Sequence, residues 1–191
     1  MATTDKASPR DRLLEAAAEL FYRDGVSIGV EALCRSAGVS KRSMYQLFDS
    51  KDEMLAASLE RRRPWYEAQM IGPAGTVPAT PRERIRYVFE RTAEASVSPD
   101  YRGCPYLAVL VELKDPEHPA SAVARAVKDR LQSFFREQAE RGGAADPDVL
   151  ARQLMLVFDG ASARAGARIE RLDDGLTART ADALMDAAGM N

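Results

Sequence analysis

The chain has 191 residues, a formal net charge of −2 and 46% hydrophobic residues. This composition is typical of a globular protein with one sizeable core, or with a small module beside a larger one. It excludes a strongly basic nucleic-acid-binding protein, because residues 1–63 carry 11 Lys and Arg against 10 Asp and Glu. A single His and two distant cysteines, Cys34 and Cys104, argue against a Cys/His metal site.

Membrane and export signals are not evident in the sequence. No apolar run approaches the roughly 20 residues that span a bilayer. The N-terminal stretch MATTDKASPRDR has no apolar segment of the signal-peptide type. We therefore expect a cytoplasmic protein without a membrane partner, and no residue pattern calls for a cofactor.

The first two predicted elements are helices. Apolar residues recur every three or four positions in RDRLLEAAAELFYR, residues 10–23, which indicates one helical face. Gly25 is expected to end this helix. A second, short helix follows at about 30–37, and Gly38 is expected to break it.

Two further helices are marked by serine caps. Ser40 is placed to cap a helix over residues 41–48. Ser50 is placed to cap the next one, with Glu53 completing a capping box. That fourth helix is expected to extend to about Met70.

The rest of the chain also has helical periodicity, after a loop rich in Pro and Gly at residues 71–81. The sequence therefore predicts an all-α fold with about nine helices. The later helices are expected at about 81–97, 104–114, 119–141, 147–170 and 176–188.

The second and third helices are joined by the tight AGVS corner. Two short helices with a Gly-containing turn form a helix-turn-helix, and the second helix of such a unit enters the DNA major groove. On the helix KRSMYQLF, residues 41–48, the apolar side chains Met44, Leu47 and Phe48 share one face and are expected to be buried. The opposite face is polar.

The polar face suits DNA recognition. Arg42 can donate two hydrogen bonds to guanine, and Gln46 can pair similarly with adenine. Hydroxyl and ammonium groups commonly bind phosphate, as do the free N–H groups of a helix N-terminus. The alternative is an ordinary solvated helix. The predicted DNA-contact residues are Ser40, Lys41, Arg42, Ser43, Tyr45, Gln46 and Lys51.

Residues 12–55 resemble the DNA-binding domain of the tetracycline-repressor (TetR/AcrR) family of bacterial regulators. The matching runs are RLLEAAAELFYRDGV and VEALCRSAGVSKRSMYQLFDSKDEML. The resemblance matches Ser40, Lys41, Ser43, Tyr45 and Lys51 to the family's DNA-contact positions, with Tyr45 and Lys51 on phosphates. Arg42 departs from the family, in which many members have a small residue at that position.

The resemblance also implies a domain organisation. Residues 1–50 would form the helix-turn-helix DNA-binding domain, and residues 51–191 a helical domain for ligand binding and dimerisation. The basic residues Lys6, Arg10 and Arg12 are expected either to touch DNA as an arm or to form a tail without contacts.

The dimer surface is expected in the last two helices, because the stretch 150–169 is rich in small residues that allow helices to approach closely. Together they would form half of a four-helix bundle across a two-fold axis. The alternative is that these helices only close the core of one protomer. The predicted dimer residues are Leu154, Val157, Ala161, Arg164, Ala165 and Leu184.

A ligand pocket is expected among the aromatic side chains of the second domain, because pockets are mostly apolar with a few placed polar groups. Each of these aromatics is alternatively an ordinary core residue. The predicted pocket residues are Trp65, Tyr66, Tyr87, Tyr106, Phe134 and Phe158.

Four reactive or charged side chains stand apart from these groups. Asp159 lies in an apolar run and needs a partner, which is a dimer mate, an Arg such as Arg164, or a ligand. Glu112 is expected at the surface or in the pocket, and His118 in a turn or capping the next helix. Cys104 is a buried thiol or a redox-active thiolate at a helix start.

Two functions remain open from these patterns. The first is a dimeric repressor that a small-molecule ligand releases from operator DNA. The second is a DNA-binding regulator without an inducer, whose second domain serves only dimerisation or a protein partner. An enzyme is not expected, because no nucleophile elbow, phosphate loop or paired catalytic motif is present.

Overall fold

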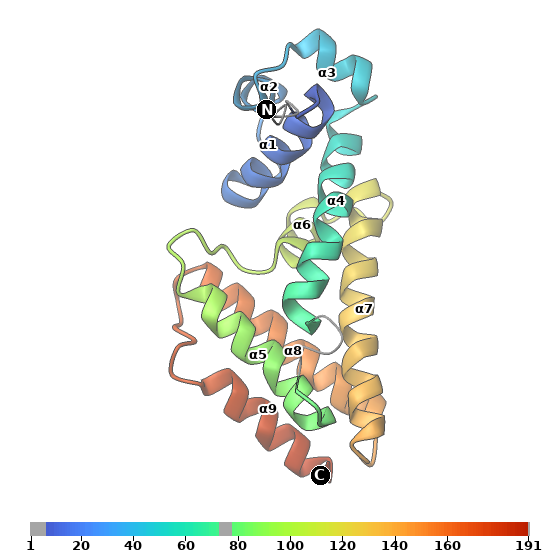
Figure 1. Cartoon of the computed structure of the whole chain (residues 1–191), viewed down its shortest axis with the longest axis vertical. Coiled ribbons are helices and arrows are strands. Elements are labelled where there is room, and N and C mark those ends of the chain that lie inside the picture. The colour runs from blue at the N-terminus through green and yellow to red at the C-terminus, as the bar shows by residue number, and fades with distance from the viewer. Residues whose placement is uncertain (1–6, 73–77, 191) are drawn as a thin grey trace, which may run out of the picture. The chain divides into compact units, whose positions relative to one another are not determined.

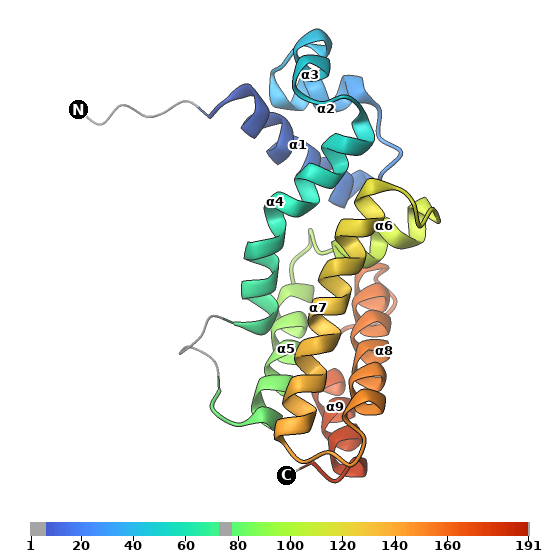
Figure 2. The ribbon, with the colours of Figure 1, turned by 90° about the vertical axis from the view of Figure 1, so that its right-hand side faces the viewer.

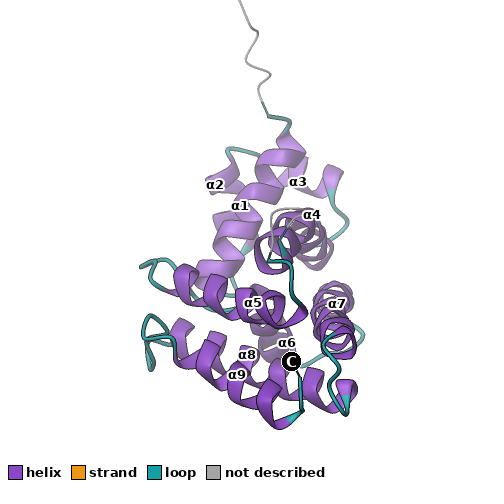
Figure 3. Ribbon diagram, turned by 60° about the horizontal axis from the view of Figure 1, so that its bottom comes forward, coloured by secondary structure: helices purple, strands orange, loops and turns teal. Residues whose placement is uncertain are grey.

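The computed structural model describes residues 7–72 and 78–190, and every regular element in these two stretches is a helix (Figure 3). The all-α fold with nine helices is confirmed within them. The helices are α1 (Pro9–Asp24), α2 (Val30–Ala37), α3 (Lys41–Leu47), α4 (Lys51–Ile71), α5 (Pro81–Ser96), α6 (Pro105–Leu113), α7 (Pro119–Arg141), α8 (Pro147–Gly166) and α9 (Leu176–Ala187).

The predicted boundaries agree with these helices to within a few residues, except at the end of α8. The helix was expected to reach about residue 170, but it ends at Gly166. Beyond it, Arg168 has a left-handed φ of 59°, and the Ile169 N–H turns back to donate to the Arg164 carbonyl at 2.9 Å. These contacts reverse the chain direction ahead of α9.

The chain forms two compact units. Unit 1 consists of residues 1–62 with residues 109–124, and unit 2 consists of residues 63–108 with residues 125–191. These units are defined by compactness and do not test the predicted division into domains at residue 50, which stays a prediction. Figures 1 and 2 show the helices of each unit.

The core of unit 1 begins with α1, which Ser8 caps by accepting from the Asp11 N–H at 3.0 Å. Gly25 ends α1 with a φ of 86°, as predicted. Gly38 ends α2 in the left-handed conformation, φ 62°, which a glycine adopts without strain. Met44 and Phe48 of the α3 segment are buried against this core.

Residues Lys51 to Leu59 continue the core of unit 1. Ser50 accepts from the Glu53 N–H at 3.0 Å, as expected of its cap. The Glu53 carboxylate accepts from the Asp49 N–H at 2.6 Å, one residue earlier than in the usual capping box. The start of this helix is therefore held on both sides by local hydrogen bonds.

Unit 2 contains α5, α8 and α9, which lie side by side (Figures 1 and 3). Phe89 of α5 stacks on Phe135 of α7 with ring centres 5.8 Å apart. Arg82 of α5 bridges to α9 through Asp186 at 2.6 Å and the Met190 carbonyl at 3.1 Å. Unit 2 thus has an apolar interior, and an ion-pair connection joins two of its helices.

The small residues of α8 pack inside this chain. A Cβ on Gly166 would lie 2.5 Å from the Arg102 backbone, and a Cβ on Gly103 would lie 2.8 Å from the Ser162 carbonyl oxygen. Ala161 and Ala165 share a buried cluster with Leu172. The small side chains therefore allow the segment before α6 to approach α8 closely.

Candidate nucleic-acid interface

Helix α3 presents a polar face to solvent because its apolar face is buried. Met44 is fully buried, whereas Tyr45 is 50% exposed and Arg42 and Gln46 are exposed. Leu47, predicted to be buried, is 37% exposed, since it lies at the edge of the apolar face. This seven-residue helix therefore offers a compact set of donors and acceptors.

The N-terminus of α3 is organised by its serines. Ser40 accepts from the Ser43 N–H at 3.0 Å, which confirms the predicted cap. The two serine hydroxyls also bond to each other at 2.8 Å. Both serines therefore define where α3 begins.

Lys41 is not a free cation in this structure. Its Nζ donates to Glu31 of α2 at 2.6 Å. The hydrogen bond from Lys41 lowers the pKa of Glu31, and the same bond raises the pKa of Lys41. Both side chains are exposed, so a phosphate would compete with Glu31 for the ammonium group.

Lys51 is also engaged within the chain. Its Nζ donates to the Val26 carbonyl at 2.8 Å and to the Ile28 carbonyl at 3.4 Å. An ammonium has three N–H donors, so one remains for a phosphate. Sequence reasoning missed this role, because 25 residues separate Lys51 from Val26.

The basic residues before α2 have mainly internal contacts. Arg12 donates to the Ala37 carbonyl at 3.0 Å and to the Ala7 carbonyl at 3.0 Å. Arg10 lies over the Phe48 ring, 5.1 Å from its centre. Lys6, the third residue of the proposed arm, lies outside the described residues. Arg12 thus supports the turn between α2 and α3.

Two predicted pocket residues lie together in unit 2. The rings of Tyr66 and Tyr106 meet edge to face at 4.9 Å, and the Tyr66 hydroxyl donates to the Cys104 Sγ at 3.2 Å. Burial raises the pKa of Tyr66 well above its usual value, so the phenol stays protonated and keeps this bond. Trp65 does not share this burial, since it is 63% exposed.

The other predicted pocket aromatics have different surroundings. Tyr87 is half-buried, whereas Phe134 and Phe158 are buried. The Lys128 Nζ lies 4.8 Å from the centre of the Phe158 ring, and the same ammonium pairs with Asp159. Lys128 is thus the partner that Asp159 requires, and sequence reasoning did not identify it.

A polar group that the sequence did not single out lies against Phe134. The Arg84 guanidinium is 5.4 Å from the centre of the Phe134 ring. Its buried Nε has no hydrogen-bond partner, and neither has the Oε1 of Gln138, which is 2% exposed one turn later on α7. Four further buried side-chain atoms of the described residues also lack a hydrogen-bond partner: Arg91 Nε, Ser162 Oγ, Thr177 Oγ1 and Asp182 Oδ1.

The predicted dimer residues divide by burial. Leu154, Ala161 and Ala165 are buried in their own chain, so they offer almost no surface to a second copy. Val157 and Leu184 are half-buried, and the exposed Arg164 pairs with Glu170 at 3.2 Å. The reason is register: the small residues at 161 and 165 face the protomer's core. The exposed stripe of α8 is Val149, Gln153, Leu156, Gly160 and Ala163.

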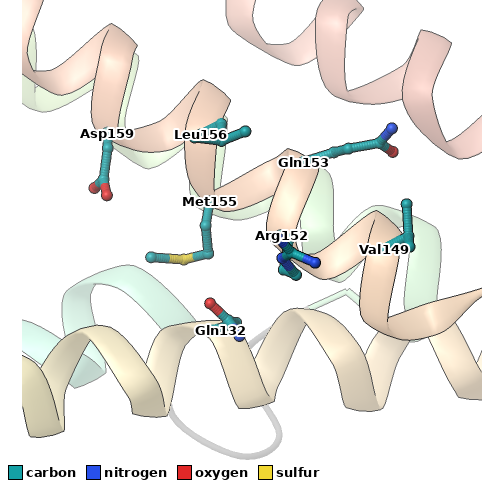
Figure 4. Close-up of a pocket in the computed structure, with 7 residues that line it drawn as sticks. All are labelled: Gln132, Val149, Arg152, Gln153, Met155, Leu156 and Asp159. Atoms are coloured by element: carbon teal, nitrogen blue, oxygen red, sulfur yellow. The ribbon is translucent and has the colours of Figure 1, made fainter.

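A groove of about 400 Å³ lies along α7 and α8 (Figure 4). Met155, Arg152 and Asp159 point toward α7, which carries Gln132, while Leu156 points away from it. None of the six predicted pocket aromatics lines this groove. It is thus a surface groove whose lining includes Val149, Gln153 and Leu156 of the exposed stripe.

No described helix is long and apolar enough to cross a membrane. Within the same residues, no three His, Cys, Asp or Glu side chains gather as a metal site would require.

The fold and the α2–α3 geometry define a helix-turn-helix regulator. The family model of bacterial regulatory proteins, tetR family, matches residues 13–58. A TetR transcriptional regulator (SAV143) from Streptomyces avermitilis is 62% identical, with a TM-score of 0.93 over 97% of this chain and 100% of that one. SCO4454, a TetR-family regulator from Streptomyces coelicolor, is 25% identical, with a TM-score of 0.85 over 94% of this chain and 95% of that one.

A third relative matches over a shorter part of both chains. The uncharacterized HTH-type transcriptional regulator Rv1255c of Mycobacterium tuberculosis is 40% identical over 110 residues, which is 50% of this chain and 54% of that protein. The chain thus spans about half the length of the curated relatives it matches. The chain belongs to the tetR family, as the sequence resemblance predicted. It is a TetR-family, DNA-binding transcriptional regulator.

Proposed function

We propose that this regulator binds operator DNA as a homodimer through α3 and is released by a small-molecule effector. The observation that carries the DNA-binding part is the exposed polar face of α3. Arg42, Tyr45 and Gln46 are exposed there, and their side chains make no hydrogen bond or ion pair to any described residue. Because the target is bacterial DNA, we also infer that the protein acts in the cytoplasm.

The three side chains have different chemical roles in this proposal. Arg42 and Gln46 each present a planar group that can make two hydrogen bonds to a base edge. Tyr45 has one hydroxyl, which suits a phosphate oxygen and fixes position without reading sequence. Ser40, Lys41, Ser43 and Lys51 are proposed to support the same contacts, Lys41 after leaving Glu31.

The experiment is fluorescence anisotropy with a duplex selected from random sequences and with a random duplex. Tyr45→Ala is expected to weaken binding to both duplexes, whereas Arg42→Ala and Gln46→Ala mainly reduce the preference for the selected one, by roughly 1–3 kcal/mol. Arg136→Ala, at an exposed position on α7, is the control. Equal losses on both duplexes for all three variants would contradict the division of roles.

The dimer is proposed to form through α8 and α9. A helix-turn-helix reads one half-site, so a second copy is needed for a full operator. The exposed α8 stripe supports this, because it combines apolar Leu156 and Val149 with the small Gly160 and Ala163. Val157, Arg164 and Leu184 lie at its margins in this proposal.

The effector is proposed to bind in unit 2 near Arg84, Phe134 and Gln138. A buried polar atom without a partner costs roughly 1–3 kcal/mol, so the Arg84 Nε, whose guanidinium lies over the Phe134 ring, favours a ligand site, and the Gln138 Oε1 one turn after Phe134 supports it. The other arginines near Arg84 are paired: Arg82 with Asp186, and Arg86 with Glu90 at 3.0 Å. A guanidinium over an aromatic ring suits an anion with an apolar body.

The alternative is a regulator without an effector, whose second domain serves only dimerisation or a protein partner. Thermal shift separates the two, because a ligand that binds only the native state raises Tm. Aromatic acids would be compared with their neutral amides on the native chain and on Arg84→Gln. We expect acids to raise Tm only in the native chain. A compound that raises the Tm of the native and the Arg84→Gln proteins equally would show that Arg84 does not contact the ligand.

A further inference from the structure

The loop between α1 and α2, residues 25–29, is held by charged side chains from elsewhere in unit 1. Its last residue, Gly29, is the N-cap of α2 and has no side chain to cap it. The loop's backbone groups are bound instead by Lys51 of α4 and Glu112 of α6. The Lys51 ammonium donates to the Val26 and Ile28 carbonyls, and the Glu112 carboxylate accepts from the Val26 N–H.

Both charges meet at Val26. The Glu112 Oε2 accepts from the Val26 N–H at 2.7 Å, and the Lys51 Nζ donates to the Val26 carbonyl at 2.8 Å. A hydrogen bond to a charged group is roughly twice as strong as one between neutral groups. One residue of the loop is thus held on its donor side and on its acceptor side.

Gly25 makes room for this contact. A Cβ at Gly25 would lie 2.3 Å from the Glu112 Oε1, and the φ of 86° is one that residues with side chains rarely adopt. The backbone conformation therefore favours glycine at this position, and the missing Cβ leaves room for the carboxylate in its observed place.

The segment that carries Glu112 has a second attachment to α4. The His118 Nε2 lies 3.4 Å from the Asp52 Oδ1. The His118 Nδ1 accepts from the Ala120 N–H at 3.1 Å, so of the two predicted places, a turn or a helix cap, the histidine takes the cap of α7. Residues 109–124 thus contact the α1–α2 loop and the start of α4 within one compact unit.

We propose that Glu112 is a positioning residue for DNA recognition. It fixes the loop at Val26, and through that loop the starting point of α2 and the orientation of α3. It lies on α6, outside the residues 13–58 that match the family model. The inference rests on the proposed reading of DNA through α3.

The sign of the effect distinguishes this role from simple electrostatics. Glu112 is an exposed anion in the unit that carries α3. Removing an anion from a DNA-binding unit ordinarily strengthens binding, because repulsion with phosphates is reduced. If Glu112 positions α3, its removal weakens binding to the preferred sequence instead.

The test compares Glu112→Ala with Glu117→Ala, which removes the same charge from an exposed position in the same unit. The full chain is titrated with the selected duplex and with a random duplex, at a temperature at which circular dichroism shows both variants folded. We expect Glu112→Ala to lose roughly tenfold in affinity for the selected duplex. Binding to random DNA is expected to be unchanged or tighter, as for Glu117→Ala with both duplexes.

Glu112→Gln provides the rescue, because its amide oxygen still accepts from the Val26 N–H. It is expected to retain most of the preference for the selected duplex. Equal losses on both duplexes would indicate a merely structural role and overturn the proposal. So would a Glu112→Ala chain that behaves like Glu117→Ala. A native chain with no preference for any selected duplex would refute both this inference and the proposed reading through α3.

Discussion

At the scale of single residues, the polar face of α3 is not uniformly available to DNA. Arg42, Tyr45 and Gln46 are exposed and have no partner among the residues described, whereas Lys41 and Lys51 already have acceptors inside the chain. Both lysines are predicted to contact phosphate, but their ammonium groups must exchange or share a partner to do so. The free energy of binding therefore includes a cost that the sequence alone does not show.

Glu31 is the residue that sets this cost for Lys41. We expect Glu31→Gln to strengthen binding to all duplexes by roughly two- to fivefold, because it frees Lys41 and removes an anion near the phosphates. Anisotropy at low and high salt would measure the change, with Glu19→Gln on α1 as the control. Unchanged affinity at low salt would mean that Lys41 does not reach a phosphate.

At the scale of elements, the close approach of α8 to the segment before α6 depends on glycine. Gly160 and Gly166 lie on the same helix, but only Gly166 meets backbone, while a Cβ on Gly160 would have open space around it. The two positions therefore form a matched pair. The same substitution should have opposite effects on stability.

We expect Gly166→Ala to destabilise the protein by roughly 1–3 kcal/mol, because the new methyl group overlaps the Arg102 backbone. Gly160→Ala is expected to stabilise the single protomer by roughly 0.5–1 kcal/mol through better helix propensity, apart from any effect on the proposed dimer contact of Gly160. Urea unfolding at one protein concentration would measure both. If both variants are stabilised, α8 and residues 102–103 do not pack as closely as described.

At the scale of the whole molecule, the proposed function requires two copies. The exposed stripe of α8 combines Leu156, which is 75% exposed, with the exposed Val149 and the small residues Gly160 and Ala163. Burying these apolar side chains against a second copy would favour association, which supports a dimer contact on α8. The two recognition helices of such a dimer would bind two half-sites.

We expect Leu156→Glu to produce monomers in sedimentation velocity, because a buried unpaired carboxylate opposes association. Affinity for a two-half-site duplex should fall roughly 100-fold, while affinity for one half-site stays unchanged. Val97→Glu, at another exposed apolar position of unit 2, is the control. A Leu156→Glu chain that remains dimeric would place the interface elsewhere.

The sequence by itself determined the local features of this protein. Apolar spacing, the serine caps at Ser40 and Ser50, and the glycines at 25 and 38 were sufficient to predict the helices and the turn between α2 and α3. The physical reason is that helix starts and ends depend on residues within one or two turns. The family resemblance was likewise carried by a continuous stretch of sequence, residues 12–55.

Only the tertiary structure decided which charged side chains already have a partner within the chain and which small side chains are buried. Glu112 and Val26 are 86 residues apart, and Lys128 and Asp159 are 31 apart, so no local pattern could pair them. The register of α8, which buries Ala161 and exposes Leu156, depends on its neighbours in unit 2. Long-range packing sets these partners because each side chain contacts whatever the folded backbone brings within a few ångströms, and periodicity alone does not specify that neighbour.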